Sequence, residues 1–204
     1  MGVSGPVTRV RELLRSLNGD AGYGWALLGC CALLLALTAT GDAGRALLRY
    51  DRAPLAAGQL WRLVSAHLVH LDAHHALLNC LGLVLVWALF ARDYRPRQWL
   101  LITLVSMAAI DAGLWLWDST VRWYVGSSGV LHGFMAAGTL ARLRRGETEG
   151  WVLAAFLVGK LAWEQGVGPL PLSGSDPVVV DAHLYGVAGG LAAAAFLRRG
   201  SEPL

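Results

Sequence analysis

Two short strings place a hydroxyl and an imidazole where a membrane helix would normally avoid polar groups. The first, YVGSSGVLHGF from Tyr124 to Phe134, contains Ser128, and the second, DAHLYGVAGG from Asp181 to Gly190, contains His183. A serine hydroxyl is a poor nucleophile until a base removes its proton, and imidazole suits that task near neutral pH. The two strings therefore predict a serine nucleophile with a histidine base.

The glycines around Ser128 suit a reactive helix start. Gly126 can adopt backbone angles that other residues avoid and so permits a sharp entry, while Gly129 permits close approach of a neighbouring helix. Ser128 is then expected in the first helical turn, where unpaired backbone N–H groups favour a developing oxyanion. The alternative is that Ser127 or Ser128 only caps the helix.

The string around His183 predicts a helix that packs closely against the one containing Ser128. Gly186 and Gly190 form a G-x-x-x-G face, and Asp181 is expected as the N-cap. Asp181 is a poor third partner for His183, because residues two apart do not share a helical face. The alternative reading of His183 is a histidine whose ring extends to the membrane interface.

The string HHALLN, residues 74–79, adds candidate donors to an oxyanion. His75 and Asn79 are four residues apart and project from one helical face. His67, His70 and His74 also follow helical spacing, which raises a metal site as an alternative. No acidic or cysteine ligand accompanies them at a familiar spacing and HExxH is absent, so we predict neither a metal nor another cofactor.

The elements that must position these residues are apolar helices. Of the 204 residues 55% are hydrophobic and 15% charged, and the mean hydropathy is +0.49, which is too apolar for a soluble domain of this length. Six windows are long and apolar enough to predict an all-α membrane protein with six spans. The windows are residues 23–41, 74–91, 98–117, 127–141, 151–168 and 182–197.

The arginines predict the orientation of this bundle. With the N-terminus inside, the inner segments contain eleven arginines and the outer loops five. Both termini are therefore expected in the cytoplasm, and the net charge of +3 reflects topology, with no nucleic-acid patch. We expect a cytoplasmic N-terminal segment at 1–22, the six-span domain at 23–198 and a cytoplasmic tail at 199–204.

Polar residues at one depth complete the prediction. The second, fourth and sixth spans all enter from the outer side, so His75, Asn79, Ser128 and His183 are expected together near that side. Lys160 and Glu164, four apart in the fifth span, are expected to pair with each other, or else Glu164 or Gln165 contacts substrate. Asp111 in the third span is expected to bond to the first outer loop.

These motifs resemble the rhomboid intramembrane serine proteases. The resemblance rests on GSSG, on AHLYGVAGG, on HHALLN preceded by His70, and on Trp61 with Arg62 in the first outer loop. The motifs occur in the right order, on the right helices and at one depth. Within this family, YVGSSGVLHG, KLAWEQ and DAHLYG look like the rhombosortase subfamily.

The resemblance implies a six-helix rhomboid-like bundle in a bacterial inner membrane, with the active site toward the periplasm. It makes Ser128 the nucleophile and His183 the general base and acid, with His75, Asn79 and the Ser128 N–H as the oxyanion site. Many rhomboids have tyrosine four residues after the serine, packed on the catalytic histidine, where this chain has His132. His132 either orients His183 or is only a packing substitute.

The subfamily implies the substrates. They would be exported proteins held in the lipid bilayer by a C-terminal tail with a Gly-Gly pair, a single span and an arginine cluster. Two other rhomboid functions stay open, a general protease of single-span membrane proteins and a proteolytically silent protein that binds membrane clients. A small transporter is the alternative from another class, and the lack of an inverted repeat argues against it.

Overall fold

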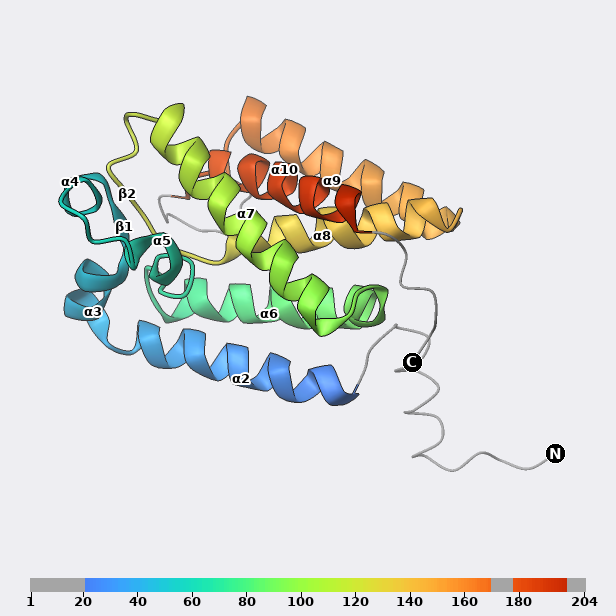
Figure 1. Ribbon diagram of the computed structural model, residues 1–204, viewed down its shortest axis with the longest axis horizontal. Helices are drawn as coiled ribbons and strands as arrows, with labels where there is room; N and C mark the ends of the chain where they lie inside the picture. Colours follow the sequence, from blue (N-terminus) through green and yellow to red (C-terminus); the bar gives the residue numbers. More distant parts are fainter. Residues whose placement is uncertain (1–20, 170–177, 198–204) are drawn as a thin grey trace.

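A computed structural model describes residues 21–169 and 178–197 of the chain. It is mainly helical, with one short antiparallel strand pair (Figure 1). The predicted segments 1–22 and 199–204 lie almost entirely outside the described residues, as do residues 170–177. The long helices are α2 (Ala21–Thr38), α6 (Ala73–Phe90), α7 (Pro96–Leu116), α8 (Ser128–Arg144), α9 (Thr148–Gly166) and α10 (Asp181–Phe196).

Each long helix coincides with one of the six apolar windows. Two described helices are long and apolar enough to cross a bilayer unaided, α7 and the helical stretch Ala73–Asp93 that contains α6. A third candidate combines α2 with α3 (Gly41–Leu48) across a bend of 108°. The helices α8 and α10 have 17 and 16 residues, near the lower limit for a span. The chain is an integral membrane protein.

Helix α8 packs against α6, α7, α9 and α10, and α10 packs mainly against α8 and α7, while α2 lies beside α6 (Figure 1). Glycines make the closest of these contacts. A Cβ built on Gly190 would lie 2.1 Å from the Gly133 carbonyl oxygen, so no larger residue fits there without separating α8 and α10. The predicted close approach of these helices along the Gly186 and Gly190 face is confirmed.

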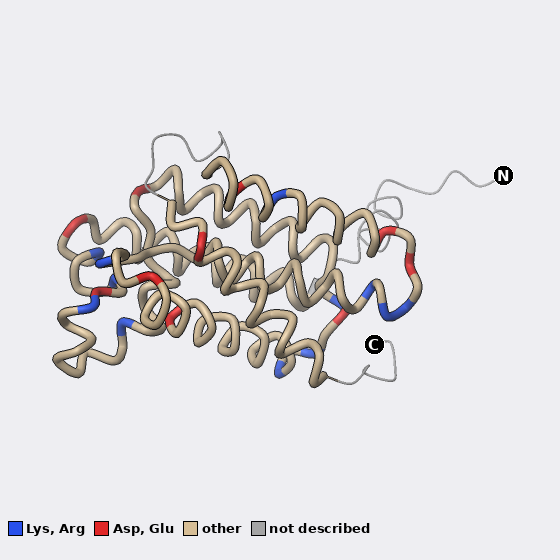
Figure 2. Tube along the Cα trace, turned by 90° about the horizontal axis from the view of Figure 1, so that it is seen from above, with Lys and Arg blue, Asp and Glu red and all other residues tan. Residues whose placement is uncertain are grey.

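Large apolar side chains cover much of the outer surface. Trp25, Leu81, Trp151 and Phe156 are all more than half exposed. Most of the arginines of the described residues gather at the two ends of the bundle, away from its middle (Figure 2). An apolar belt with charged ends is the surface expected of a protein that lies in a bilayer.

The loop between α2 and α6 is folded, which the apolar windows did not predict. It contains α3, strand β1 (Tyr50–Asp51), α4 (Arg52–Ala56) and α5 (Arg62–Ser65). The Arg62 side chain is buried and donates to the carbonyl oxygens of Ala46 and Arg49 at 2.9 and 2.8 Å. One guanidinium therefore ties α5 to the C-terminal end of α3.

The same loop holds the segment that precedes Ser128. Strand β1 pairs with β2 (Trp123–Tyr124), with Tyr50 opposite Tyr124. The Gly126 N–H donates to the Ala66 carbonyl oxygen at 2.9 Å. The entry to α8 is thus fixed by backbone bonds to a loop more than fifty residues earlier in the chain.

Candidate active site

Helix α8 begins at Ser128, as the GSSG string predicts. Gly126 has φ of +117°, a conformation that L side chains rarely adopt. A Cβ on Gly129 would lie 2.7 Å from the Ala182 carbonyl oxygen in α10. Both predicted glycine roles, the sharp entry and the close helix approach, are confirmed.

Ser128 lies against His183. Its Oγ is 2.9 Å from His183 Nε2, although 55 residues separate them in the chain. His183 is buried within the bundle and Ser128 is half-buried, so the imidazole does not extend to the interface. The geometry is that of a hydroxyl whose proton can pass to an adjacent base.

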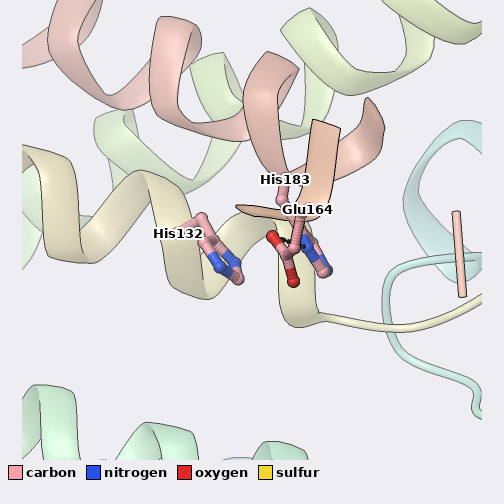
Figure 3. Close-up of side chains that lie close together, drawn as sticks. All are labelled: His132, Glu164 and His183. Carbon is pink, nitrogen blue, oxygen red and sulfur yellow. Dashed lines mark hydrogen bonds and ion pairs between the residues drawn. The ribbon is translucent and has the colours of Figure 1, made fainter. Parts of the chain in front are cut away.

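The other nitrogen of His183 contacts an acidic residue that the sequence did not assign to the site. His183 Nδ1 lies 2.9 Å from Glu164 Oε2 on α9 (Figure 3). Lys160 Nζ lies 2.6 Å from the other carboxylate oxygen, so the predicted pairing of Lys160 with Glu164 is confirmed. The depth argument could have found this contact, because α9 ends on the side where α10 begins.

His132 stacks on His183. The ring centroids are 4.1 Å apart and the planes differ by 13°. His132 Nδ1 lies 2.7 Å from the Ser128 carbonyl oxygen. A carbonyl only accepts, so Nδ1 carries the proton and His132 does not bond to His183 through it.

Ser127, the residue before Ser128, bonds to residues of the loop before α6 and of α6 itself. It occupies the N-cap position of α8 but makes no side-chain cap bond, so the capping alternative is wrong for this residue. Its Oγ donates to Asn79 Oδ1 at 3.1 Å and lies 3.2 Å from His70 Nε2. Burial, followed by the charge of His75, lowers the pKa of His70 to about 3.

The two candidate oxyanion residues are placed differently. His75 and Ser128 line one cavity of about 300 Å³, which residues 120–125 also line. Asn79 is buried, with its amide nitrogen donating to the His75 carbonyl at 2.9 Å and its oxygen accepting from Ser127. The amide group of Asn79 is therefore engaged with Ser127 and the α6 backbone.

Asp181 does not act as the expected N-cap. Helix α10 begins at Asp181 itself, Val180 takes the N-cap position, and no side-chain cap bond is present. Asp111 Oδ1 lies 3.3 Å from His67 Nε2 in the loop before α6, which is the predicted partner region.

One group of described residues brings three potential metal ligands together, two histidines and a glutamate. His132, Glu164 and His183 offer ligand atoms within 4.8 Å of one another. The two rings are stacked, so their in-plane lone pairs run side by side and do not converge on one point. Both nitrogens of His183 already face Ser128 and Glu164. The geometry fits a hydrogen-bonded relay better than a metal site. Among the described residues, His67, His70 and His74 do not form a group that could hold a metal ion.

Comparison with known protein families shows the family of this chain. The profile of the rhomboid domain matches residues 57–200, more than half of the chain. The chain belongs to the rhomboid family. The matched region of this rhomboid includes Ser128, His183 and the Arg62 loop anchor. The comparison with curated proteins finds no match.

Proposed function

We propose that this rhomboid is an intramembrane serine endopeptidase. The observation that carries the proposal is the 2.9 Å approach of Ser128 Oγ to His183 Nε2 at the start of α8, within a rhomboid domain. Ser128 Oγ attacks the substrate carbonyl carbon while its proton moves to His183 Nε2. His183 then returns the proton to the leaving amine as the C–N bond breaks, and water or another nucleophile releases the acyl group.

The oxyanion formed in this step would sit at the N-terminal end of α8. The Ser128 N–H lies there, where helical N–H groups lack partners within the helix, and His75 lines the same cavity. Asn79 is the third candidate donor. His132 and the glycines Gly126 and Gly129 support the site by packing and backbone geometry. The six-span bundle, cytoplasmic termini and periplasmic-side site in a bacterial inner membrane belong to this proposal.

The substrates we propose are those of rhombosortases, exported proteins with a C-terminal Gly-Gly pair, one span and an arginine cluster. A rhomboid must unwind part of a substrate helix before its serine reaches a carbonyl. Each glycine lowers that cost by about 1 kcal/mol relative to alanine. The arginine cluster would hold the tail in the orientation that presents the glycines to the outer face.

The test is co-expression with two membrane-anchored reporters. One carries the Gly-Gly, single-span, arginine-rich tail and the other an ordinary type I single-span segment. We expect cleavage of the first, lost in Ser128→Ala and His183→Ala, with a double variant little worse than either single one because the pair acts as a unit. Cleavage of the second reporter alone would favour a general rhomboid protease. If neither reporter is cleaved, the result would favour a protein that binds membrane clients without cleaving them.

Ser127→Ala is the matched control for Ser128→Ala. It removes the neighbouring hydroxyl, which contacts His70 and Asn79. We expect this variant to cleave the first reporter. Activity in Ser128→Ala together with a folded but inactive Ser127→Ala would assign the nucleophile to Ser127.

A further inference from the structure

Glu164 fixes which nitrogen of His183 carries the proton. A carboxylate only accepts hydrogen bonds, so the 2.9 Å contact with Glu164 Oε2 places the proton on His183 Nδ1. Nε2 is then the free lone pair, and it faces Ser128 Oγ. This is the tautomer that a general base for Ser128 requires.

Glu164 is itself held in place by a second partner. Its side chain is 3% exposed and Lys160 Nζ lies 2.6 Å from Oε1. The two carboxylate oxygens of Glu164 therefore have different partners: Oε1 bonds to Lys160 and Oε2 to His183. An isolated charge at this depth would be expensive, and the lysine four residues earlier on α9 compensates it.

We propose that Glu164, held by Lys160, is a positioning residue that makes Ser128 and His183 part of a serine, histidine and glutamate triad. Glu164 orients the imidazole through Nδ1 and stabilises the imidazolium formed when Ser128 loses its proton. This inference rests on the proposed protease function. The competing explanation is that Lys160 and Glu164 form an ion pair that only stabilises α9.

The first experiment reads the hydrogen bond without needing activity. Proton NMR of the full-length protein in detergent, labelled with ¹⁵N-histidine, should show a downfield Nδ1–H resonance that disappears in His183→Ala. We expect the same resonance to be lost or moved strongly upfield in Glu164→Gln and unchanged in Glu149→Gln, an exposed glutamate at the start of the same helix. A His183 resonance that is unaffected by Glu164→Gln would overturn the proposal.

The second experiment separates positioning from stability. Glu164→Gln should lower kcat by roughly 10⁴-fold, the scale seen when the acidic member of such a triad becomes an amide, with KM little changed. If Glu164 only stabilises α9, the variant will unfold at lower denaturant while kcat per folded molecule stays near the wild-type value. That outcome also contradicts the proposal.

A double variant guards against misfolding. Glu164→Gln alone leaves the partly buried Lys160 without its carboxylate partner, whereas Lys160→Met with Glu164→Gln removes both charges. The double variant should remain folded and be as slow as Glu164→Gln. If the wild-type protein cleaves neither reporter, the protease proposal fails, but the Nδ1–H resonance still decides whether Glu164 holds His183.

Discussion

Gly186 of α10 lies directly against the backbone of Gly129 in α8. A Cβ built on Gly186 would come within 1.9 Å of the Gly129 carbonyl oxygen. Gly129 lies one residue after Ser128, and Gly186 lies three residues after His183. This contact therefore sets how far apart the two helices hold the hydroxyl and the imidazole. The packing of α8 against α10 and the distance between Ser128 and His183 are therefore set by the same contact.

Gly186→Ala should destabilise the protein and reduce its activity together. The added methyl meets a backbone atom that cannot rotate away, and overpacking of this kind costs about 1 to 3 kcal/mol, more than the roughly 1 kcal/mol that alanine gains in helix propensity. The measurements are the denaturation midpoint in detergent and the rate of Ser128 labelling by a fluorophosphonate.

Gly159→Ala in α9 is the matched control, because a Cβ there meets nothing within 4 Å. It carries the same gain in helix propensity without the clash, so its midpoint should equal or exceed that of the wild type. A Gly186→Ala protein that behaves like Gly159→Ala would show that α8 and α10 can separate without harming the site.

His75→Ala should lower turnover more than Asn79→Ala. Loss of one oxyanion donor costs on the order of 100-fold or more in kcat, and His75 lines the cavity beside Ser128. The Asn79 amide is engaged with Ser127 and the His75 carbonyl. Steady-state kinetics on a cleavable reporter peptide measure both variants, and the reverse order would mean that Asn79 turns toward the oxyanion when substrate binds.

His132→Phe should keep measurable activity, within about 10-fold of the wild type. Phenylalanine preserves the ring that stacks on His183 and loses the Nδ1–H bond to the Ser128 carbonyl, whose net value is about 1 kcal/mol. His132→Ala removes the ring and should lose more, because His183 then has an open space on one face. Equal and complete inactivity of folded His132→Phe and His132→Ala would instead indicate a direct chemical role.

Stability should fall with acid because His70 is buried uncharged. Its pKa is lowered to about 3 in the folded protein, and an unfolded histidine titrates near about 6.5. The unfolded chain therefore takes up the proton first as the pH falls. The contribution of His70 to the free energy of unfolding is complete above about pH 6.5. It declines as the pH falls toward 3, by at most about 1.4 kcal/mol per pH unit.

Denaturant unfolding in detergent between pH 4 and pH 8 checks this dependence. His70→Gln should be less stable at neutral pH, because the contact with Ser127 changes, but should depend less steeply on pH. His74→Gln alters an exposed histidine four residues later and should keep the wild-type slope. An unchanged slope in His70→Gln would assign the acid sensitivity to other groups.

The sequence by itself predicted the six long helices and most of the candidate site. Apolar windows located all six long helices because a span needs an uninterrupted run of apolar residues. The strings around Ser128 and His183 predicted their depth and the glycine contact, because both signals are local: a helix start and a spacing of four. Their order along the chain was also enough to suggest the rhomboid family, which the domain match at residues 57–200 bears out.

Only the tertiary structure decided which side chains the polar residues of the site contact. Glu164 could face Lys160, a substrate or His183, and helical spacing indicates only the first of these. The contact of Glu164 with His183 depends on the rotation of α9 about its own axis and on the distance between α9 and α10. A local sequence pattern predicts neither of these. The same holds for Asn79, which faces Ser127 because the folded loop at residues 42–72 fixes the entry to α8. Long-range packing selects among polar contacts that the sequence leaves equally possible.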